Sequence, residues 1–427
     1  MIITETCACL LLLIIQSGGA KAPAKPGAAG EKFEVGFVEK KIATIPGSGS
    51  IEGRAYFSPS GRKVAYVIKE GNKLVPVIDD KKGKSYHYVD PPVWAAAADH
   101  VAWRVGNRLA DNEHERWWVF LDDKKIAEDD WIGSIGLSPD GKQAAYWLNP
   151  GARIDKEGVY QGGKWIFAFG NKKSSEFSQG FGLEAPVWSP DGKQVVTFTQ
   201  KANNASLMIN DKVIETKGAA FFMLDSFVFS RDGKRLAYTA HQGGAGGKMR
   251  CHVQVGEEKY GLKFDDAGSP IISPDGKKIA YRVLTGDKLQ IAIDQTVASK
   301  QYDVLGAAVF SPDNKKLVFA ANKGGTVHSS MAVTSYAVHN SKGGKWFMVA
   351  GDQEKEEFDM VDDPVFSNDG KSLAYRAKSN GKWHVIVNDK KSEAFDDVDA
   401  PVFSSDGKKV AFGARIDREF WWKVLDL

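Results

Sequence analysis

The sequence contains few cysteines and nearly equal numbers of basic and acidic residues, and each of these features excludes a class of protein. Only three of the 427 residues are cysteine, and two of them, Cys7 and Cys9, lie in an apolar stretch at the N-terminus. The remaining one, Cys251, has no cysteine beside it in the body of the chain, which excludes a disulfide-rich extracellular scaffold. The net charge of +3, from 57 basic and 54 acidic residues, gives no reason to expect a nucleic acid as the main partner.

Long apolar runs are also lacking. The longest, residues 7–15 (CACLLLLII), is too short to span a bilayer, so we expect no transmembrane segment. It matches the apolar core of a secretory signal peptide, although Glu5 stands where basic residues are usual. We therefore expect a signal peptide over residues 1–22, a Pro/Gly/Ala linker over residues 23–32, and a periplasmic or secreted protein. An unprocessed N-terminus is the alternative.

The body of the chain contains a repeated phrase, of which Val-Phe-Ser-Pro-Asp-Gly-Lys-Lys-Val-Ala-Tyr is the idealised form. Its serine recurs at residues 58, 138, 189, 230, 273, 311, 367 and 404, and a degenerate copy has Ala95 in its place. The intervals between copies range from 37 to 56 residues and centre near 40. A period of this length is typical of a four-stranded propeller blade.

Each repeat predicts four short strands, A to D. Pro-Asp-Gly forms a tight turn, because proline presets φ and glycine accepts a positive φ. The apolar residues on either side of that turn predict strands A and B of a hairpin. Strand C usually opens with an aromatic residue, as at Trp383, and a polar turn leads to a short strand D. No long segment has helical periodicity.

The repeats predict an all-β fold, a single β-propeller of four-stranded blades over residues 33–427. Nine copies are counted, and eight blades is the alternative if the copy at Ala95 is not a blade. Residues 33–47 have the pattern of a C–D segment without a preceding A–B hairpin, and the chain stops at Leu427 after a strand C. We therefore expect an N-terminal strand to complete the last blade and close the ring.

The repeated Ser-Pro-Asp-Gly-Lys turn, followed by an apolar residue, Ala and Tyr, resembles the repeat of TolB-type propellers and, more loosely, of WD-repeat proteins. The resemblance covers nearly all of the chain after residue 32 and implies the fold more than a function. TolB proteins place an α/β domain before the propeller, and related peptidases add an α/β-hydrolase domain. Neither pattern is seen here, and there is no Gly-x-Ser-x-Gly motif.

Antiparallel order places the A–B and C–D turns on one face of the propeller and the B–C and D–A loops on the other. The first face carries stereotyped lysine-rich turns and is expected to be structural. The second face carries two long B–C insertions, residues 149–164 and 322–345, and acids next to strand A. Insertions gathered on one face typically mark a binding face.

The candidate binding residues therefore lie on the second face, where acids would rim the central channel and attract a cation or a basic peptide. Strand-capping or arginine-paired acids are the alternative interpretation. The candidate residues are Asp90, Asp130, Asp266, Asp363, Asp397, Asp399, His328, Tyr336 and His339. No catalytic residue or metal ligand is assigned, and no cofactor is expected, with Ca²⁺ at the 396–399 acids as the alternative.

Three functions are compatible with these patterns. The first is a monomeric, non-catalytic propeller that recruits a protein or peptide through its B–C and D–A loops. The second is an enzyme that acts on a carbohydrate or lactone at the channel mouth, and the third is a structural component of the cell envelope. The absence of a recognisable catalytic constellation favours the first.

Overall fold

The computed structural model describes residues 35–427 except 111–113, 156–159, 178, 181–184, 202–203, 216–220, 223–226, 244–248, 328–331 and 334–340. Over these residues the regular structure consists of β-strands and contains no helix, and hence none that is long and apolar enough to cross a membrane. The chain divides into two compact units, one of residues 43–216 and one of residues 35–42 together with 217–427. Each unit is described by itself.

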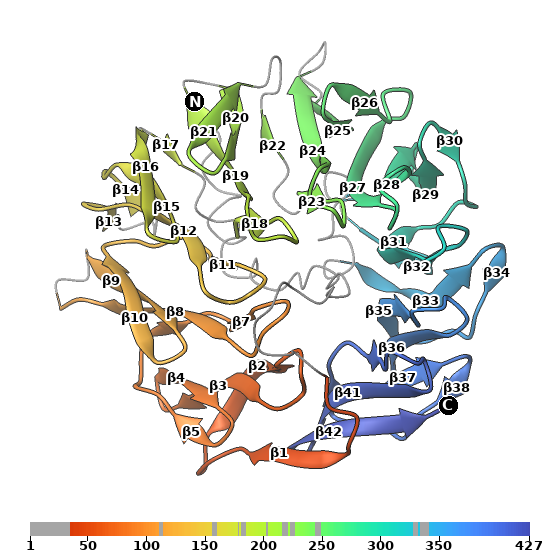
Figure 1. Ribbon diagram of the computed structural model, residues 1–427, viewed down its shortest axis with the longest axis horizontal. Coiled ribbons are helices and arrows are strands. Elements are labelled where there is room, and N and C mark those ends of the chain that lie inside the picture. Colours follow the sequence, from red (N-terminus) through yellow and green to blue (C-terminus); the bar gives the residue numbers. More distant parts are fainter. Residues whose placement is uncertain are drawn as a thin grey trace. The chain divides into compact units, whose positions relative to one another are not determined.

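The first unit contains four sheets, coloured from red-orange to yellow-green in Figure 1. The first sheet consists of β2 (Ser50–Phe57), β3 (Val64–Glu70), β4 (Lys73–Ile78) and β5 (Lys81–Lys82). The second consists of β6 (Tyr88–Val89), β7 (Val93–Trp94), β8 (Val101–Arg108), β9 (Glu115–Leu121) and β10 (Lys124–Asp129). The third consists of β11 (Gly136–Leu137), β12 (Ala144–Leu148), β15 (Trp165–Phe169) and β16 (Lys172–Phe177), with a separate hairpin of β13 (Arg153–Ile154) and β14 (Tyr160–Gln161). The fourth consists of β17 (Gln179–Gly180), β18 (Val187–Trp188), β19 (Val195–Lys201), β20 (Asn204–Ile209) and β21 (Lys212–Glu215).

The second unit contains five sheets. The first two consist of β22 (Phe221–Phe222), β23 (Val228–Phe229), β24 (Leu236–Gly243), β25 (Met249–Val255) and β26 (Glu258–Tyr260), and of β27 (Asp266–Ile272), β28 (Ile279–Thr285), β29 (Lys288–Ile293) and β30 (Thr296–Val297). The next two consist of β31 (Val304–Phe310), β32 (Leu317–Thr326), β33 (Lys342–Ala350) and β34 (Gln353–Glu354), and of β35 (Met360–Phe366), β36 (Leu373–Ser379), β37 (Lys382–Val387) and β38 (Lys390–Lys391). The last consists of β39 (Asp397–Val398), β40 (Val402–Phe403), β41 (Lys409–Ile416), β42 (Glu419–Asp426) and β1 (Lys40–Thr44).

The sheets confirm the predicted all-β propeller. Their strands pair antiparallel and largely in chain order, so strands A to D follow the predicted sequence, with strand A split in two in four sheets. Consecutive four-stranded antiparallel sheets are the blades of a propeller. The degenerate copy at Ala95 lies between β7 and β8 of a complete sheet, so the described residues form nine such sheets and not eight.

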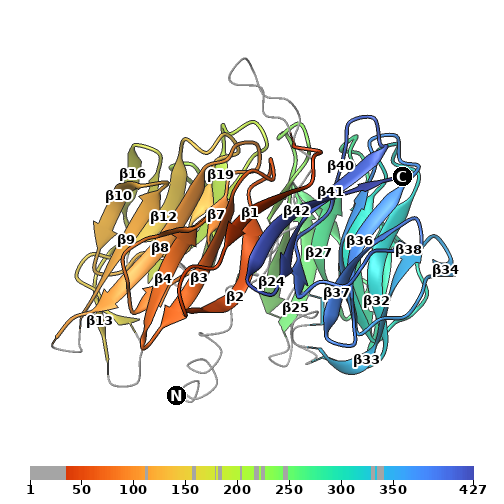
Figure 2. The same cartoon turned by 90° about the horizontal axis from the view of Figure 1, so that it is seen from below.

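The N-terminal strand completes the last sheet of the second unit. Figures 1 and 2 both show β1 beside β42, and the two strands are paired. The indole Nε1 of Trp422 donates to the Gly36 carbonyl at 2.6 Å, and the Lys423 ammonium lies 2.9 Å from Glu39. The strand predicted from the N-terminal pattern therefore supplies strand D to a sheet that would otherwise end at β42.

Each Ser-x-Asp-Gly turn joins strands A and B through its own hydrogen bonds. In the last sheet the Ser404 hydroxyl donates to Asp406 at 2.6 Å and accepts from the Lys409 amide at 2.9 Å. The Asp406 carboxylate also accepts from the Lys408 amide at 3.1 Å. The same three bonds recur at the turns that begin at Ser138, Ser189, Ser230, Ser273, Ser311 and Ser367. The repeated motif therefore has a structural role.

Two adjacent serines in the last sheet allow a matched test of this role. Ser404 is buried and makes both bonds, whereas Ser405 takes the proline position of the motif and is exposed. We expect Ser404→Ala to lower the free energy of unfolding by about 1–2 kcal/mol, because the half-buried Lys409 amide loses its acceptor. Ser405→Ala should change it by less than about 0.5 kcal/mol. Equal values for the two variants in urea unfolding would contradict this role.

The core lies between neighbouring sheets, as expected for blades too thin to shield their own faces. One cluster joins the β31–β34 sheet to the β35–β38 sheet through Trp346, Phe358, Tyr375 and Ile386, all at most 3% exposed. In the first unit a larger cluster centres on Trp131, Trp147 and Phe167. Aromatic side chains at fixed repeat positions thus fill the spaces between sheets.

Candidate partner-binding site

Two of the predicted site acids, Asp90 and Asp266, are bound to groups of their own unit. Asp90 forms an ion pair of 3.0 Å with the buried Arg104, whose guanidinium lies 4.2 Å from the Trp117 ring centroid. Asp266 accepts from the Cys251 amide at 2.7 Å. Burial raises the pKa of Asp90 and Asp266, with Arg104 opposing the shift at Asp90 and hydrogen bonds from Cys251 opposing it at Asp266.

Asp130 belongs to a recurrent capping arrangement. Its carboxylate lies 3.1 Å from Arg116 and accepts from the Gly151 amide at 2.7 Å, 21 residues further along the chain. The same 21-residue spacing joins Asp265 to Gly286, Asp303 to Gly324, Asp359 to Asn380 and Asp396 to Asp417. These acids therefore cap the B–C turn of the following sheet, which is the capping interpretation of the sequence.

A different arrangement surrounds Arg376 of β36. Its Nε lies 2.6 Å from Asp363 and its Nη2 lies 3.3 Å from Asp362, both on β35. Its Nη1 donates to the Val398 carbonyl at 3.3 Å, which brings strand A of the last sheet, with Asp397 and Asp399, to the same guanidinium. We call Asp362, Asp363, Asp397, Asp399 and Arg376 the Arg376 cluster. It brings together three of the predicted site residues.

Four carboxylates gather around one guanidinium in the Arg376 cluster. The Arg376 side chain is buried, and its guanidinium stacks at 4.8 Å over the Trp383 ring. Burial alone would lower the pKa of Arg376, but the nearby carboxylates, Asp363 first, raise it above its ordinary value. Arg376 therefore stays charged and attracts all four acids.

The structure places these acids along strand A rather than only in the D–A loop. Asp362 pairs across from Arg376 in the ladder, and the register shifts between Asp362 and Val365. Asp363 lies at this bulge with φ of 51°, a left-handed conformation that aspartate tolerates better than most residues. The bulge turns consecutive carboxylates toward one arginine.

Two other sheets carry an arginine at the same position, after the aromatic residue of strand B. Arg104 is paired with Asp90 alone, as described above, and Arg282 donates to the Gly306 carbonyl at 2.8 Å. Strand A of the Arg282 sheet has Gly268 and Ser269 where β35 has Asp362 and Asp363. The Ala-aromatic-Arg pattern in the sequence could have identified this position.

Both long B–C insertions leave their sheets through the same arrangement of a buried asparagine and two glycines. Asn149 and Asn322 are buried, and their side-chain amides donate to the Gly162 and Gly343 carbonyls at 3.4 and 3.2 Å. In both, a Gly-Gly-Lys-Trp sequence with two positive φ values leads into strand C. We call this arrangement the insertion base.

The described part of the 322–345 insertion folds back onto its own unit. Ala332 and Val333 are buried in a cluster with Leu305 and Phe347, and the Ser269 hydroxyl donates to the Val333 carbonyl at 2.9 Å. The predicted site residues His328, Tyr336 and His339 lie outside the described residues.

The 149–164 insertion is anchored by a buried carboxylate that sequence analysis did not identify. Glu115 is 3% exposed and accepts from the Trp117 indole at 3.0 Å and from the Tyr160 hydroxyl on β14. Burial and the hydrogen bond to Glu115 raise the pKa of Tyr160, so the phenol remains protonated and continues to donate. Glu115 thus ties the β13–β14 hairpin to the β6–β10 sheet.

Metal ligands are not gathered anywhere in the described part of the chain: no three His, Cys, Asp or Glu side chains there are placed to hold an ion. The Ca²⁺ alternative at the 396–399 acids has no further support, because Asp396 is paired with Lys382 at 2.5 Å and caps Asp417.

No protein-family model and no curated protein sequence matches this chain. Solved structures that are similar to it include named β-propellers, and the similarities described here are of low identity. A eukaryotic initiation factor matches with a TM-score of 0.43 and 11% identity over 90% of this chain and 87% of that chain. The Dos1 propeller matches with a TM-score of 0.41 and 10% identity over 90% and 95%.

A putative TolB from Agrobacterium tumefaciens matches with a TM-score of 0.32 and 15% identity over 61% of this chain and 94% of that chain. At these identities the similarity concerns the fold alone. The sheets described above define the class: an all-β propeller whose repeat resembles that of TolB-like and WD-repeat propellers.

Proposed function

We propose that the protein is a non-catalytic binding propeller that recruits a protein or peptide partner, and that the Arg376 cluster receives a basic segment of that partner. The observation that carries the proposal is the gathering of carboxylates there: four act on the Arg376 guanidinium, whereas Arg104 is paired with Asp90. A lysine or arginine from a partner would add an attractive charge beside these carboxylates.

The partial exposure of the two acids on β35 supports the same assignment. Asp362 and Asp363 are 14% and 17% exposed, so their carboxylates are desolvated enough to interact strongly but remain open to a partner.

We also propose that the protein acts as a monomer in the periplasm or outside the cell, with residues 1–22 as a cleaved signal peptide and residues 23–32 as a linker before the propeller.

The test is fluorescence anisotropy with an array of labelled octapeptides that differ in lysine and arginine content. We expect binding to increase with basic content and Asp397→Asn/Asp399→Asn to weaken it by about tenfold, because two attractive charges are lost while Arg376 keeps both β35 acids. The matched control is Asp275→Asn/Asp313→Asn, which removes the same charge from two A–B turns. Equal weakening by both pairs, or no preference for basic peptides, would contradict the proposal.

A further inference from the structure

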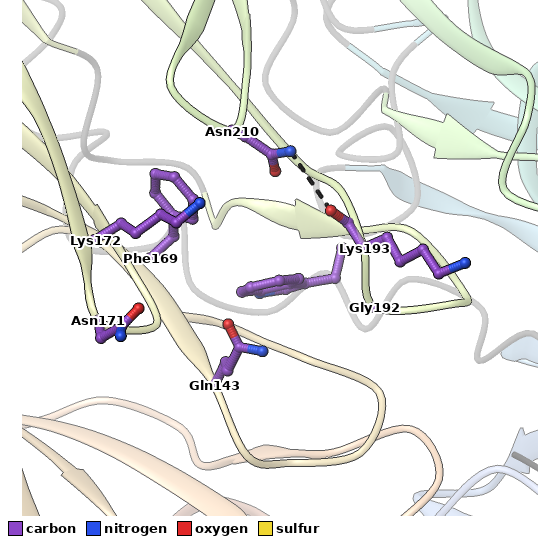
Figure 3. A pocket seen from close by; sticks show the side chains of 8 residues that line it. Gln143, Phe169, Asn171, Lys172, Gly192, Lys193 and Asn210 are labelled. Carbon is purple, nitrogen blue, oxygen red and sulfur yellow. Dashed lines mark hydrogen bonds between the residues drawn. The ribbon is translucent and has the colours of Figure 1, made fainter. Parts of the chain in front are cut away.

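A small polar cavity lies in the first unit, at the ends of the sheets that carry the A–B and C–D turns. It has a volume of about 160 Å³ and opens between the β11–β16 sheet and the β17–β21 sheet. The lining residues are Gln143, Phe169, Asn171, Lys172, Trp188, Gly192, Lys193 and Asn210. Figure 3 shows Asn171 and Lys172 on one side of it and Lys193 on the opposite side.

Several polar groups in this cavity are not used by the fold. Within the described part of the chain, the side-chain amides of Gln143 and Asn171 make no hydrogen bond, and no carboxylate lies within 4 Å of the Lys172 ammonium. Asn210, by contrast, caps the Val195 amide at 3.0 Å and donates to the Lys193 carbonyl. Two amides and an ammonium are thus left to interact with something else.

The local charge is also unlike that of the other sheets. Seven other C–D turns contain an acid, at residues 79–80, 122–123, 211, 257–258, 294, 352 and 389. The turn at this cavity is Gly170-Asn171-Lys172-Lys173 and contains none. Elsewhere a lysine outside the turn pairs with the acid of the next C–D turn: Lys355, directly after β34, lies 2.8 Å from Asp389. At this cavity the positive charge is less compensated.

One wall of the cavity is held in place. The Trp188 indole donates to the Gly136 carbonyl at 3.0 Å, which fixes the ring. Gly170 has φ of 56°, and a Cβ there would lie 2.4 Å from Gln143 Oε1, so a larger residue would displace the end of this exposed side chain. The aromatic wall is therefore in place before any ligand enters.

The volume of the cavity and the chemistry of its lining limit the class of ligand that it can bind. The volume is below the ~300 Å³ at which pockets for drug-sized ligands begin, and it holds roughly five water molecules. An aromatic wall, amides that both donate and accept, and lysines suit a ring with several hydroxyls and one carboxylate. An acidic peptide side chain would use the lysines and leave the amides and the indole without a role.

We propose that this cavity binds one acidic sugar unit, a uronate of a larger polysaccharide. The uronate carboxylate lies between Lys172 and Lys193, its hydroxyls bond with Gln143 and Asn171, and its ring contacts Trp188. This site is separate from the Arg376 cluster and does not depend on it.

The test is calorimetric titration of the full chain with trigalacturonate, with galactotriose and triglutamate as comparison ligands. We expect trigalacturonate to bind and Lys172→Gln/Lys193→Gln to weaken it by about tenfold, since two charge contacts are lost. The control pair is Lys371→Gln/Lys390→Gln, at the same two turn positions of the β35–β38 sheet. Lys371 and Lys193 are similarly exposed, at 84% and 80%, and lie 3.6 and 3.8 Å from their own turn acids.

The control pair should leave the affinity within about twofold. A second variant, Gln143→Ala/Asn171→Ala, should weaken trigalacturonate without changing any residual binding of triglutamate. No binding of trigalacturonate at millimolar concentration, equal weakening by both lysine pairs, or binding of triglutamate as tight as that of trigalacturonate would overturn the proposal. Thermal unfolding of each variant shows that it is folded.

Discussion

Replacing Arg376 with methionine should lower the free energy of unfolding by about 3–5 kcal/mol at pH 7.5. The side chain is 7% exposed and is the counter-ion of four carboxylates. Methionine fills a similar volume but removes the cation that Asp362 and Asp363 contact and that attracts Asp397 and Asp399, and breaking a buried pair by removing one partner costs about this much. Urea unfolding measures the loss.

The loss should become smaller as the pH falls. In the variant, mutual repulsion makes the folded state bind protons more readily than the unfolded state, so acid favours folding relative to neutral pH. We expect the loss of unfolding free energy caused by Arg376→Met to be clearly smaller at pH 4.5 than at pH 7.5. Arg62→Met, which removes a pair with Asp99 in which the arginine is 57% exposed, should cost less than about 1 kcal/mol at either pH. A deficit for Arg376→Met that does not change with pH would show that the carboxylates do not repel one another.

Replacing Gly344 with alanine should cost about 3 kcal/mol. Gly344 has φ of 73°, and a Cβ there would lie 2.2 Å from Asn322 Oδ1, 2.4 Å from the Gly325 nitrogen and 2.6 Å from the Lys323 carbonyl oxygen. The left-handed backbone costs a non-glycine residue about 1–2 kcal/mol, and an overpacked contact adds about 1–3 kcal/mol. Two of the three neighbours are backbone atoms, so a change of rotamer cannot relieve the clash.

The adjacent glycine is the control. Gly343 has nearly the same φ of 71°, but the nearest atom to its Cβ is 3.9 Å away, so Gly343→Ala should cost only about 1 kcal/mol. The first unit provides an independent repeat: at Gly163 a Cβ would lie 1.8 Å from Asn149 Oδ1, and at Gly162 the nearest atom is 3.5 Å away. Equal losses within either pair of alanine variants would show that the insertion base tolerates a side chain.

The fold could be predicted from sequence because the turns and apolar strand positions that define it are local and recur in each repeat. A turn such as Ser404 to Lys409 sets its own hydrogen bonds, and the flanking apolar residues set the strands. Repetition also revealed the degenerate copy at Ala95, although sequence analysis left its status as a blade open until the structure placed it in a complete sheet. The pairing of β1 with β42 was also predictable, since the two ends carry complementary parts of one repeat.

The site was less predictable, because a carboxylate's role depends on what faces it. Sequence analysis grouped Asp130 and Asp363 as acids beside strand A, yet Asp130 caps a turn and Asp363, within β35, contacts a buried arginine. The difference comes from a bulge in β35 and from the approach of Val398 in the next sheet, neither of which has a signal within one repeat. Glu115 was missed for the same reason, since its partner Tyr160 is 45 residues away.

The insertion base has a consequence for how such a chain can diversify. A buried asparagine and a pair of glycines hold the two strands of the hairpin together where it leaves the sheet. The residues beyond this point therefore have little influence on strand pairing within the sheet. The entropic cost of closing a loop grows only slowly with its length. The two sealed positions are therefore natural grafting points, where new segments can be exchanged while the underlying sheets keep their register.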